Sequence, residues 1–209
     1  MASSRIEDVA TPEAFARNPE LVQSFYNQRR AQLAAVQPNA AHAALAMLAE
    51  RFDGDFTLVT QNVDDLHDRA LAGHASGKGF RFFHMHGELK KVRCVETDTI
   101  YGWAGDISSE SLCGCCHEVG TLRPHIVWFG EMPLYMMEIY EALARCDLFV
   151  SVGTSGNVYP AAGFASEARA RGAHTLELNL EPSQGGYLFD EARYGRATEL
   201  VPEFVKALL

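Results

Sequence analysis

The sequence predicts an α/β protein in which a parallel sheet is covered by helices on both faces. Short apolar segments rich in β-branched and aromatic residues recur along the chain, and segments with helical patterns separate them. Strands joined through helices need right-handed crossovers, which produce a parallel sheet between two helical layers. At 209 residues the chain is long enough for a single domain, residues 1–209, with a small module inside it.

Helix start signals dominate the first part of the chain. Thr11-Pro12-Glu13 and Asn18-Pro19-Glu20 each supply an N-cap, a proline for the first helical position and an acid that suits the helix dipole. Asn39 is expected to cap a second helix, which Asp53-Gly54 ends. The first strand is expected directly afterwards.

The remaining elements alternate between strands and helices. We predict strands over residues 56–59, 80–83, 126–129, 148–152 and 175–179 because these segments are apolar and rich in β-formers. Helices are expected from Asp64, around residues 135–145, over residues 161–171 and from Pro202. This order is typical of a parallel sheet.

The charge and composition of the chain argue against several classes of function. The formal net charge of -9 argues against a nucleic-acid partner, because such proteins carry a basic surface. No apolar run approaches the roughly 20 residues that span a bilayer, so no membrane role is expected. The N-terminal residues lack the apolar core of a signal peptide, and we expect a cytoplasmic protein.

Polar side chains follow two of the predicted strands, in the runs Thr60-Gln61-Asn62-Val63-Asp64 and His84-Met85-His86-Gly87-Glu88. Ligands of α/β sheets bind at such strand ends. His86 is the best candidate for a general base, although His84 competes for the role and a buried histidine bonded to a carbonyl is the structural alternative. Gln61, Asn62 and Asp64 can hold a carboxamide and sugar hydroxyls, or can simply cap the following helix.

Two later strand ends carry a further pair of polar runs. Gly153-Thr154-Ser155 suits a phosphate or a ribose, and a tight turn would use the same residues. Asn179-Leu180-Glu181 offers a carboxylate for a ribose, or again serves a turn.

Four of the five cysteines lie close together in sequence, at Cys94, Cys113, Cys115 and Cys116. They are candidates for a tetrahedral zinc site within a small module at about residues 88–125. Cys113 and Cys116 have the Cys-x-x-Cys spacing, and Cys115 or His117 has to complete the set with Cys94. A group of reduced, packed thiols is the alternative.

Tyr26 and Arg29 are three residues apart on a predicted helix, so they share one face. A phenol beside a guanidinium is a good receptor for a carboxylate, because arginine offers a bidentate fork and the hydroxyl adds a donor. Decoration of a solvated surface is the alternative.

Taken together, these runs resemble the sirtuins, NAD-dependent protein-lysine deacylases, and among them class III of the bacterial CobB type. The resemblance implies a Rossmann-like sheet with a zinc-binding module. The segments that carry it occur in the family's order: Thr60-Gln61-Asn62-Val63-Asp64, His84-Met85-His86-Gly87-Glu88, residues 123–131, Gly153-Thr154-Ser155 and Asn179-Leu180-Glu181.

The resemblance also implies roles for individual residues. His86 and Asn62 are implied as catalytic, with His86 the base at the nicotinamide ribose. NAD, a co-substrate, is implied to contact Gln61, Asn62, Asp64, Gly153, Thr154, Ser155, Asn179, Leu180, Glu181 and Ala197. Acyl-lysine peptides are implied to lie on Ile126, Val127 and Phe129. Their reaction with NAD is implied to give nicotinamide and O-acyl-ADP-ribose. Tyr26 and Arg29 match the pair that recognises succinyl- or malonyl-lysine. Cys94 and Cys113 match zinc-ligand positions of the family, whose usual first Cys-x-x-Cys is reduced here to Cys94, and Cys115 and Cys116 are expected to complete the set.

One family feature is missing from the sequence. Sirtuins open with an apolar strand that leads into Gly-Ala-Gly-Ile-Ser, and no such run precedes Thr60 here. A start assigned too late, a deliberate truncation and a shortened paralogue all fit this observation. A truncated paralogue that binds peptides or regulates without catalysis is therefore the alternative to an active deacylase.

Overall fold

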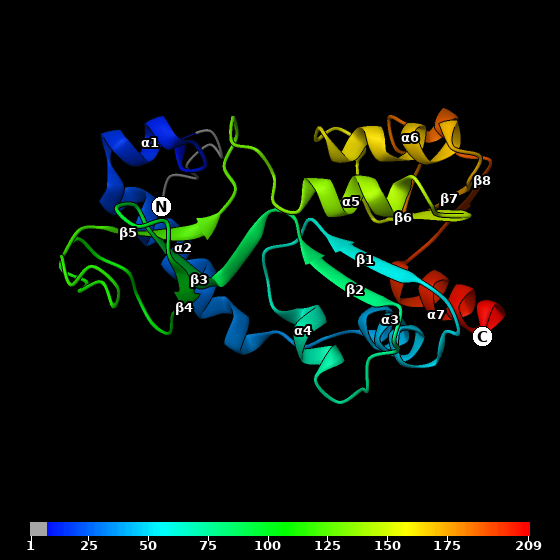
Figure 1. Ribbon diagram of the computed structural model, residues 1–209, viewed down its shortest axis with the longest axis horizontal. Coiled ribbons are helices and arrows are strands. Elements are labelled where there is room, and N and C mark those ends of the chain that lie inside the picture. Colours follow the sequence, from blue (N-terminus) through cyan, green and yellow to red (C-terminus); the bar gives the residue numbers. More distant parts are fainter. Residues whose placement is uncertain (1–7) are drawn as a thin grey trace. The chain divides into compact units, whose positions relative to one another are not determined.

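The computed structural model describes residues 8–209, which form two compact units (Figure 1). Unit 1 comprises residues 8–37, 59–65 and 83–134, and unit 2 comprises residues 38–58, 66–82 and 135–209. No helix among the described residues is long and apolar enough to cross a membrane.

The predicted parallel strands are present as two separate sheets. β6 (Leu148–Val152), β7 (His174–Asn179) and β8 (Glu191–Tyr194) form a parallel sheet in that order within unit 2. β1 (Phe56–Thr60) pairs with β2 (Phe80–His84), and both arrows point the same way in Figure 1. These strands agree closely with the prediction, except that β8 was not predicted because its sequence is short and largely polar.

Helices cover both faces of the β6–β7–β8 sheet, as predicted (Figure 1). α3 (Ala40–Arg51) and α7 (Ala197–Leu208) pack together and share a core with Leu176 and Leu178 of β7. α6 (Phe164–Ala170) packs on β6 and β7, and α5 (Met136–Leu143) packs on α6. The remaining helical elements have these bounds: α4 (Leu66–Leu71), η2 (Leu33–Ala35), η3 (Ala161–Gly163) and η4 (Gly186–Leu188).

The predicted start of the last helix was wrong. α7 begins at Ala197, and Pro202 lies inside it rather than at its first position. A proline there removes the hydrogen bond to the carbonyl four residues earlier. The helix nevertheless continues because Val201 and Val205 are fully buried in the unit 2 core, and that burial outweighs the lost bond.

Unit 1 is built from two helices and an antiparallel sheet. α1 (Pro12–Arg17) and α2 (Pro19–Gln32) begin at the predicted caps: Thr11 Oγ1 accepts from the Ala14 N–H at 3.0 Å and Asn18 Oδ1 from the Leu21 N–H at 3.1 Å. The sheet has the order β4 (Ile100–Gly102), β3 (Gly87–Cys94), β5 (Leu122–Ile126), with both pairings antiparallel.

This antiparallel sheet was not predicted. The strand expected at residues 126–129 ends at Ile126 and begins at Leu122, because Pro124 masked its first half in the sequence. β3 alternates buried and less buried positions, and its lysines and arginine lower its apolar content. Alternation of this kind marks a half-buried strand rather than a strand of a parallel core.

Candidate active site

His86 lies in unit 1, in the turn between β2 and β3. Its Nδ1 is 3.2 Å from the carbonyl oxygen of Gln61. Because a carbonyl oxygen can only accept, Nδ1 carries the ring proton and donates a hydrogen bond to it. Nε2 is then left with a free lone pair. Burial lowers the pKa of His86 below its ordinary value of 6.5, and the bond to Gln61 only partly opposes this. The imidazole is therefore neutral at neutral pH, as a general base must be.

The backbone holds the His86 turn from two sides. The Val127 N–H donates to the His86 carbonyl at 2.9 Å, and the Met85 N–H donates to the Thr60 carbonyl at 3.1 Å. Gly87 follows with φ +83, and a β-carbon at this position would lie 2.1 Å from the His125 carbonyl oxygen. Only glycine allows the strand to approach β5 this closely.

The run after β1 lies in the same unit as His86. Gln61 contacts the imidazole through its carbonyl, while Asn62 is exposed and its N–H is bound by Thr60 Oγ1 at 3.1 Å. Asp64 is half-buried further along the run. The two predicted strand ends are thus joined directly in the structure, by the bond from His86 Nδ1 to the Gln61 carbonyl and by the bond from the Met85 N–H to the Thr60 carbonyl.

Tyr26 and Arg29 differ in their surroundings, although they share α2. Tyr26 is buried, and its hydroxyl oxygen accepts from Trp128 Nε1 at 3.0 Å, which leaves the O–H free to donate. Burial raises the pKa of Tyr26, and the Trp128 bond and the charge of Arg29 oppose this. Arg29 is exposed, and its guanidinium lies 3.6 Å from the centroid of the Phe25 ring. Among the described residues it has no carboxylate partner.

An ion pair between Arg123 and Glu131, which was not predicted from the sequence, fixes the segment after β5. Arg123 donates to both carboxylate oxygens of Glu131, at 2.7 and 2.9 Å, and to the Ile126 carbonyl at 2.9 Å. Its guanidinium also lies 3.5 Å from the centroid of the Trp128 ring. Burial would raise the pKa of Glu131, but hydrogen bonds from Arg123 and Trp128 outweigh it and lower the pKa. The opposite charges eight residues apart were the available signal.

The segment Ile126, Val127 and Phe129 is held mainly through its N–H groups. Val127 donates to the His86 carbonyl and Phe129 to the Ala10 carbonyl, both at 2.9 Å, and Trp128 donates to Glu131 at 2.8 Å. Ile126 is buried, whereas the Phe129 side chain is 54% exposed. The segment is thus ordered, and it still presents apolar surface.

The four predicted cysteines come together in unit 1. Their sulfur atoms all lie within 4.8 Å of one another, with Cys94 to Cys116 at 3.7 Å and Cys113 to Cys115 at 3.2 Å. Four ligands about 2.3 Å from one tetrahedral ion stand roughly 3.8 Å apart, so this set fits zinc. Burial opposes ionisation of Cys113, but N–H groups of the loop and the Tyr101 hydroxyl lower its pKa to about 5. The cluster uses Cys115, and His117 is not among its members.

The other predicted strand ends meet in unit 2. The Asn179 side-chain amide donates to the Thr154 carbonyl at 2.8 Å, and its oxygen accepts from the Leu180 N–H at 2.9 Å. Gly153 has φ +60 and donates to the Leu178 carbonyl at 2.9 Å. The side chain of Asn179 thus ties the two runs to each other. Ser155 and Glu181 are exposed beside them, and Ala197 is the first residue of α7.

The parallel strands between helical layers and the module of clustered cysteines define a Rossmann-like α/β protein. The chain belongs to the Sir2 family, whose pattern it matches over residues 2–160. It is 58% identical to the NAD-dependent protein deacylase of Salmonella typhimurium over 207 residues, which cover 98% of this chain and 73% of that protein.

Solved structures agree with this assignment. A complex of a Sir2 homologue with NAD has a TM-score of 0.84 and 34% identity, over 98% of this chain and 77% of that one. Sir2Af2 bound to a myristoylated histone peptide has a TM-score of 0.75 and 30% identity, over 97% and 84% of the two chains.

Proposed function

We propose that this protein removes acyl groups from lysine side chains of other proteins and consumes NAD in the reaction, releasing nicotinamide and O-acyl-ADP-ribose. The observation that carries this proposal is His86, whose Nε2 is left free by the bond from Nδ1 to Gln61. A neutral imidazole held in one tautomer suits removal of a proton from a ribose hydroxyl. The deacylase relatives and the NAD-bound homologue support the same reaction.

We also propose roles for the remaining candidate residues. Gln61, Asn62 and Asp64 beside His86 bind nicotinamide and its ribose, with Asn62 assisting catalysis. The tied strand ends of unit 2 bind the nucleotide: Gly153, Thr154, Ser155, Asn179, Leu180, Glu181 and Ala197. Gly153 lets the backbone approach a phosphate or a ribose, and the Glu181 carboxylate can accept from sugar hydroxyls.

The substrate peptide lies, in this proposal, along residues 126–129 as an added strand. Since the N–H groups of Val127, Trp128 and Phe129 are already used, pairing falls to the carbonyl groups of Val127 and Phe129. The peptide therefore supplies the N–H donors. The homologue bound to a myristoylated peptide supports a peptide substrate.

The test of the reaction is release of nicotinamide from NAD by the purified protein with acetyl-lysine and succinyl-lysine peptides. Nicotinamide and deacylated peptide formed in equal amounts support the proposal. Peptide binding without any nicotinamide release contradicts it and favours a peptide-binding or regulatory protein.

Arg29→Met is expected to reduce turnover of succinyl- and malonyl-peptides by about 10- to 100-fold, because a charge-assisted bidentate bond contributes roughly 1.5–3 kcal/mol. Turnover of acetyl-peptides should change little. Arg29 is exposed and has no carboxylate partner in the described part of the chain, so it is available to a succinyl or malonyl carboxylate, to which the Tyr26 O–H can also donate. An acetyl group has no carboxylate, so its turnover does not depend on Arg29. The measurement is kcat/KM for both peptide classes.

Arg17→Met is the matched control, since Arg17 is an exposed arginine at the end of α1. It should leave both activities unchanged. An equal loss of acetyl- and succinyl-peptide turnover in Arg29→Met would remove the acid-recognition role.

The protein is further proposed to bind one structural zinc ion through Cys94, Cys113, Cys115 and Cys116. Cys94→Ser is expected to abolish bound zinc, measured by elemental analysis of the purified protein, and to lower the melting temperature because metal binding is coupled to folding. Cys146→Ser, which changes a cysteine outside the cluster, should retain zinc. Zinc retained in full by Cys94→Ser would contradict this ligand set.

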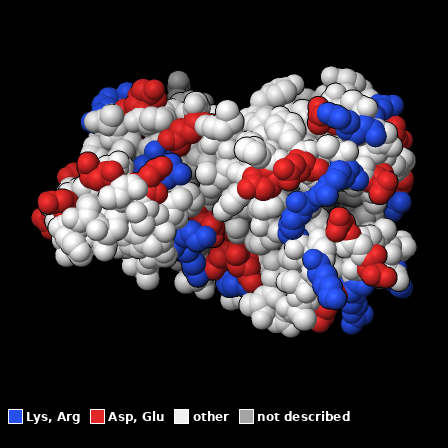
Figure 2. Space-filling model, viewed as in Figure 1, with Lys and Arg blue, Asp and Glu red and all other residues white. Residues whose placement is uncertain are grey.

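Acylated proteins, rather than nucleic acids or membranes, are proposed as partners. The net charge of -9 disfavours phosphate backbones, and the face drawn in Figure 2 shows acidic and basic side chains intermixed rather than a basic patch. The clustered free thiols suit a reducing compartment, which supports action in the cytoplasm.

A further inference from the structure

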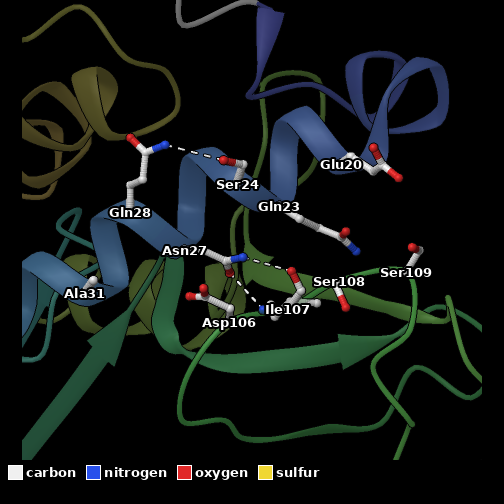
Figure 3. Close-up of a pocket in the computed structure, with 10 residues that line it drawn as sticks. All are labelled: Glu20, Gln23, Ser24, Asn27, Gln28, Ala31, Asp106, Ile107, Ser108 and Ser109. Atoms are coloured by element: carbon white, nitrogen blue, oxygen red, sulfur yellow. Dashed lines mark hydrogen bonds between the residues drawn. The ribbon is translucent and has the colours of Figure 1, made fainter. Parts of the chain in front are cut away.

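A cavity lies in unit 1, between α2 and the segment that follows β4 (Figure 3). Its volume of about 390 Å³ is large enough for a small ligand. α2 contributes residues spaced three and four apart, from Glu20 to Ala31, which form one stripe of the helix. At 100° per residue this stripe faces away from Tyr26 and Arg29, so the cavity is separate from the proposed acyl site.

The wall of the cavity is firmly built. Asn27 Nδ2 donates to the Ile107 carbonyl at 2.8 Å, and the Ile107 N–H donates back to Asn27 Oδ1 at 2.9 Å (Figure 3). Arg30 also donates to Asn27 Oδ1, at 2.8 Å, and to the Gly105 carbonyl at 3.2 Å. The segment around Ile107 is therefore fixed to α2 by side-chain bonds.

Gln23 brings an unsatisfied acceptor to this cavity. Its side chain is part of the lining and is only 3% exposed, and Nε2 donates to the Leu122 carbonyl at 3.3 Å. Oε1 is buried and has no hydrogen-bond partner among the described residues. Figure 3 shows the amide extending from α2 toward Ser108 and Ser109. A buried acceptor without a donor destabilises the folded protein, and a ligand N–H would relieve that cost.

The rest of the lining also favours a cationic donor. Glu20 and Asp106 contribute carboxylates, Ser24, Ser108 and Ser109 contribute hydroxyls, and the lining contains no lysine or arginine. In the described part of the chain neither carboxylate has an ion pair. Arg30 interacts electrostatically with Asp106. Its Nε donates to the Leu89 carbonyl and its Nη1 to the Asn27 and Gly105 oxygens, while its buried Nη2 has no hydrogen-bond partner among the described residues.

We propose that this cavity binds an alkylammonium group, carried either by a free polyamine or by an unmodified lysine side chain. One ammonium N–H satisfies Gln23 Oε1, and Glu20 and Asp106 balance the charge. Ammonium suits the site because it offers three donors and no acceptor. The binding is independent of the proposed deacylase reaction.

The test is isothermal titration calorimetry of the whole protein without NAD or acyl-peptide, using spermidine and Nα-acetyl-lysine amide. Nα-acetyl-norleucine amide, which has no ammonium group, is the uncharged control ligand. We expect millimolar or tighter binding of at least one cation and none of the control ligand. Binding of both cations identifies the shared ammonium group, whereas binding of spermidine alone identifies a free polyamine as the source.

Two variants test the residues. The double variant Glu20→Gln/Asp106→Asn and the single variant Gln23→Met are each expected to weaken binding about 10-fold or more. Glu110→Gln removes one negative charge from an exposed acid outside the lining and should bind as the wild type does. Melting temperatures identify variants that fold normally. No binding of either cation, or unchanged binding by a folded double variant, overturns the proposal.

Discussion

Gly87→Ala is expected to destabilise unit 1 by about 3 kcal/mol or more and to abolish turnover. The added β-carbon would lie 2.1 Å from the His125 carbonyl oxygen, and the backbone there has φ +83. Neither the clash nor the strain can be relieved by a side-chain rotation, because the contacted atom belongs to the backbone. β3 has to move away from β5, and His86 moves with it. Urea denaturation and nicotinamide release measure the two effects.

Gly102→Ala is the matched control. Gly102 also lies in a strand of the same sheet, but a β-carbon there meets nothing within 4 Å. It should change the stability by no more than about 0.5 kcal/mol. Equal destabilisation by the two substitutions would show that close packing at Gly87 is not what holds the His86 turn.

The sequence was sufficient for elements whose signals are local. The caps at Thr11, Asn18 and Asn39 are observed, and Asn39 forms a capping box with His42. Strand β6 was predicted with its observed bounds because it is a continuous apolar run closed by glycine. In these cases the residues that determine the local structure are also the residues of the sequence pattern, so the pattern was enough to predict it.

Elements that depend on packing against residues distant in sequence could not be predicted from local patterns. β3 and β5 are strands because they pair with each other, and Pro124 within β5 contradicts its local propensity. The start of α7 was hidden for the same reason, since the buried Val201 and Val205 sustain a helix across Pro202. Tertiary burial decides both cases.

In the candidate site, too, some features could be predicted from the sequence and others required the fold. Residue types and their strand-end positions predicted His86 and Gln61, yet the contact between them uses the Gln61 carbonyl, which every residue possesses. The sequence contains Arg123 and Glu131 within the segment 123–131, but their pairing became visible only through their hydrogen bonds. Side-chain identity can be read from sequence, whereas roles of the backbone require the fold.

His86→Ala is expected to lower NAD-dependent nicotinamide release in the presence of acyl-peptide by about 10²- to 10⁴-fold, the usual contribution of a general base. His74→Gln is the control, because His74 lies in unit 2 and pairs with Glu50 near the surface. The control should retain wild-type rates. Equal rates for His86→Ala and the wild type would exclude His86 as the base.

The pH profile and a second substitution separate proton transfer from positioning. Burial lowers the pKa of His86 below its ordinary value of 6.5, so the imidazole is mostly neutral at neutral pH and gains a proton as the pH falls. Protonated His86 cannot accept a proton, and the wild-type rate should therefore fall on the acid side with a midpoint below 6.5. His86→Gln retains an N–H that can donate to the Gln61 carbonyl but has no base in this pH range. It should fold with a near-normal melting temperature and lose both the rate and this acid limb, whereas a purely structural His86 would be replaced by glutamine with most of the rate intact.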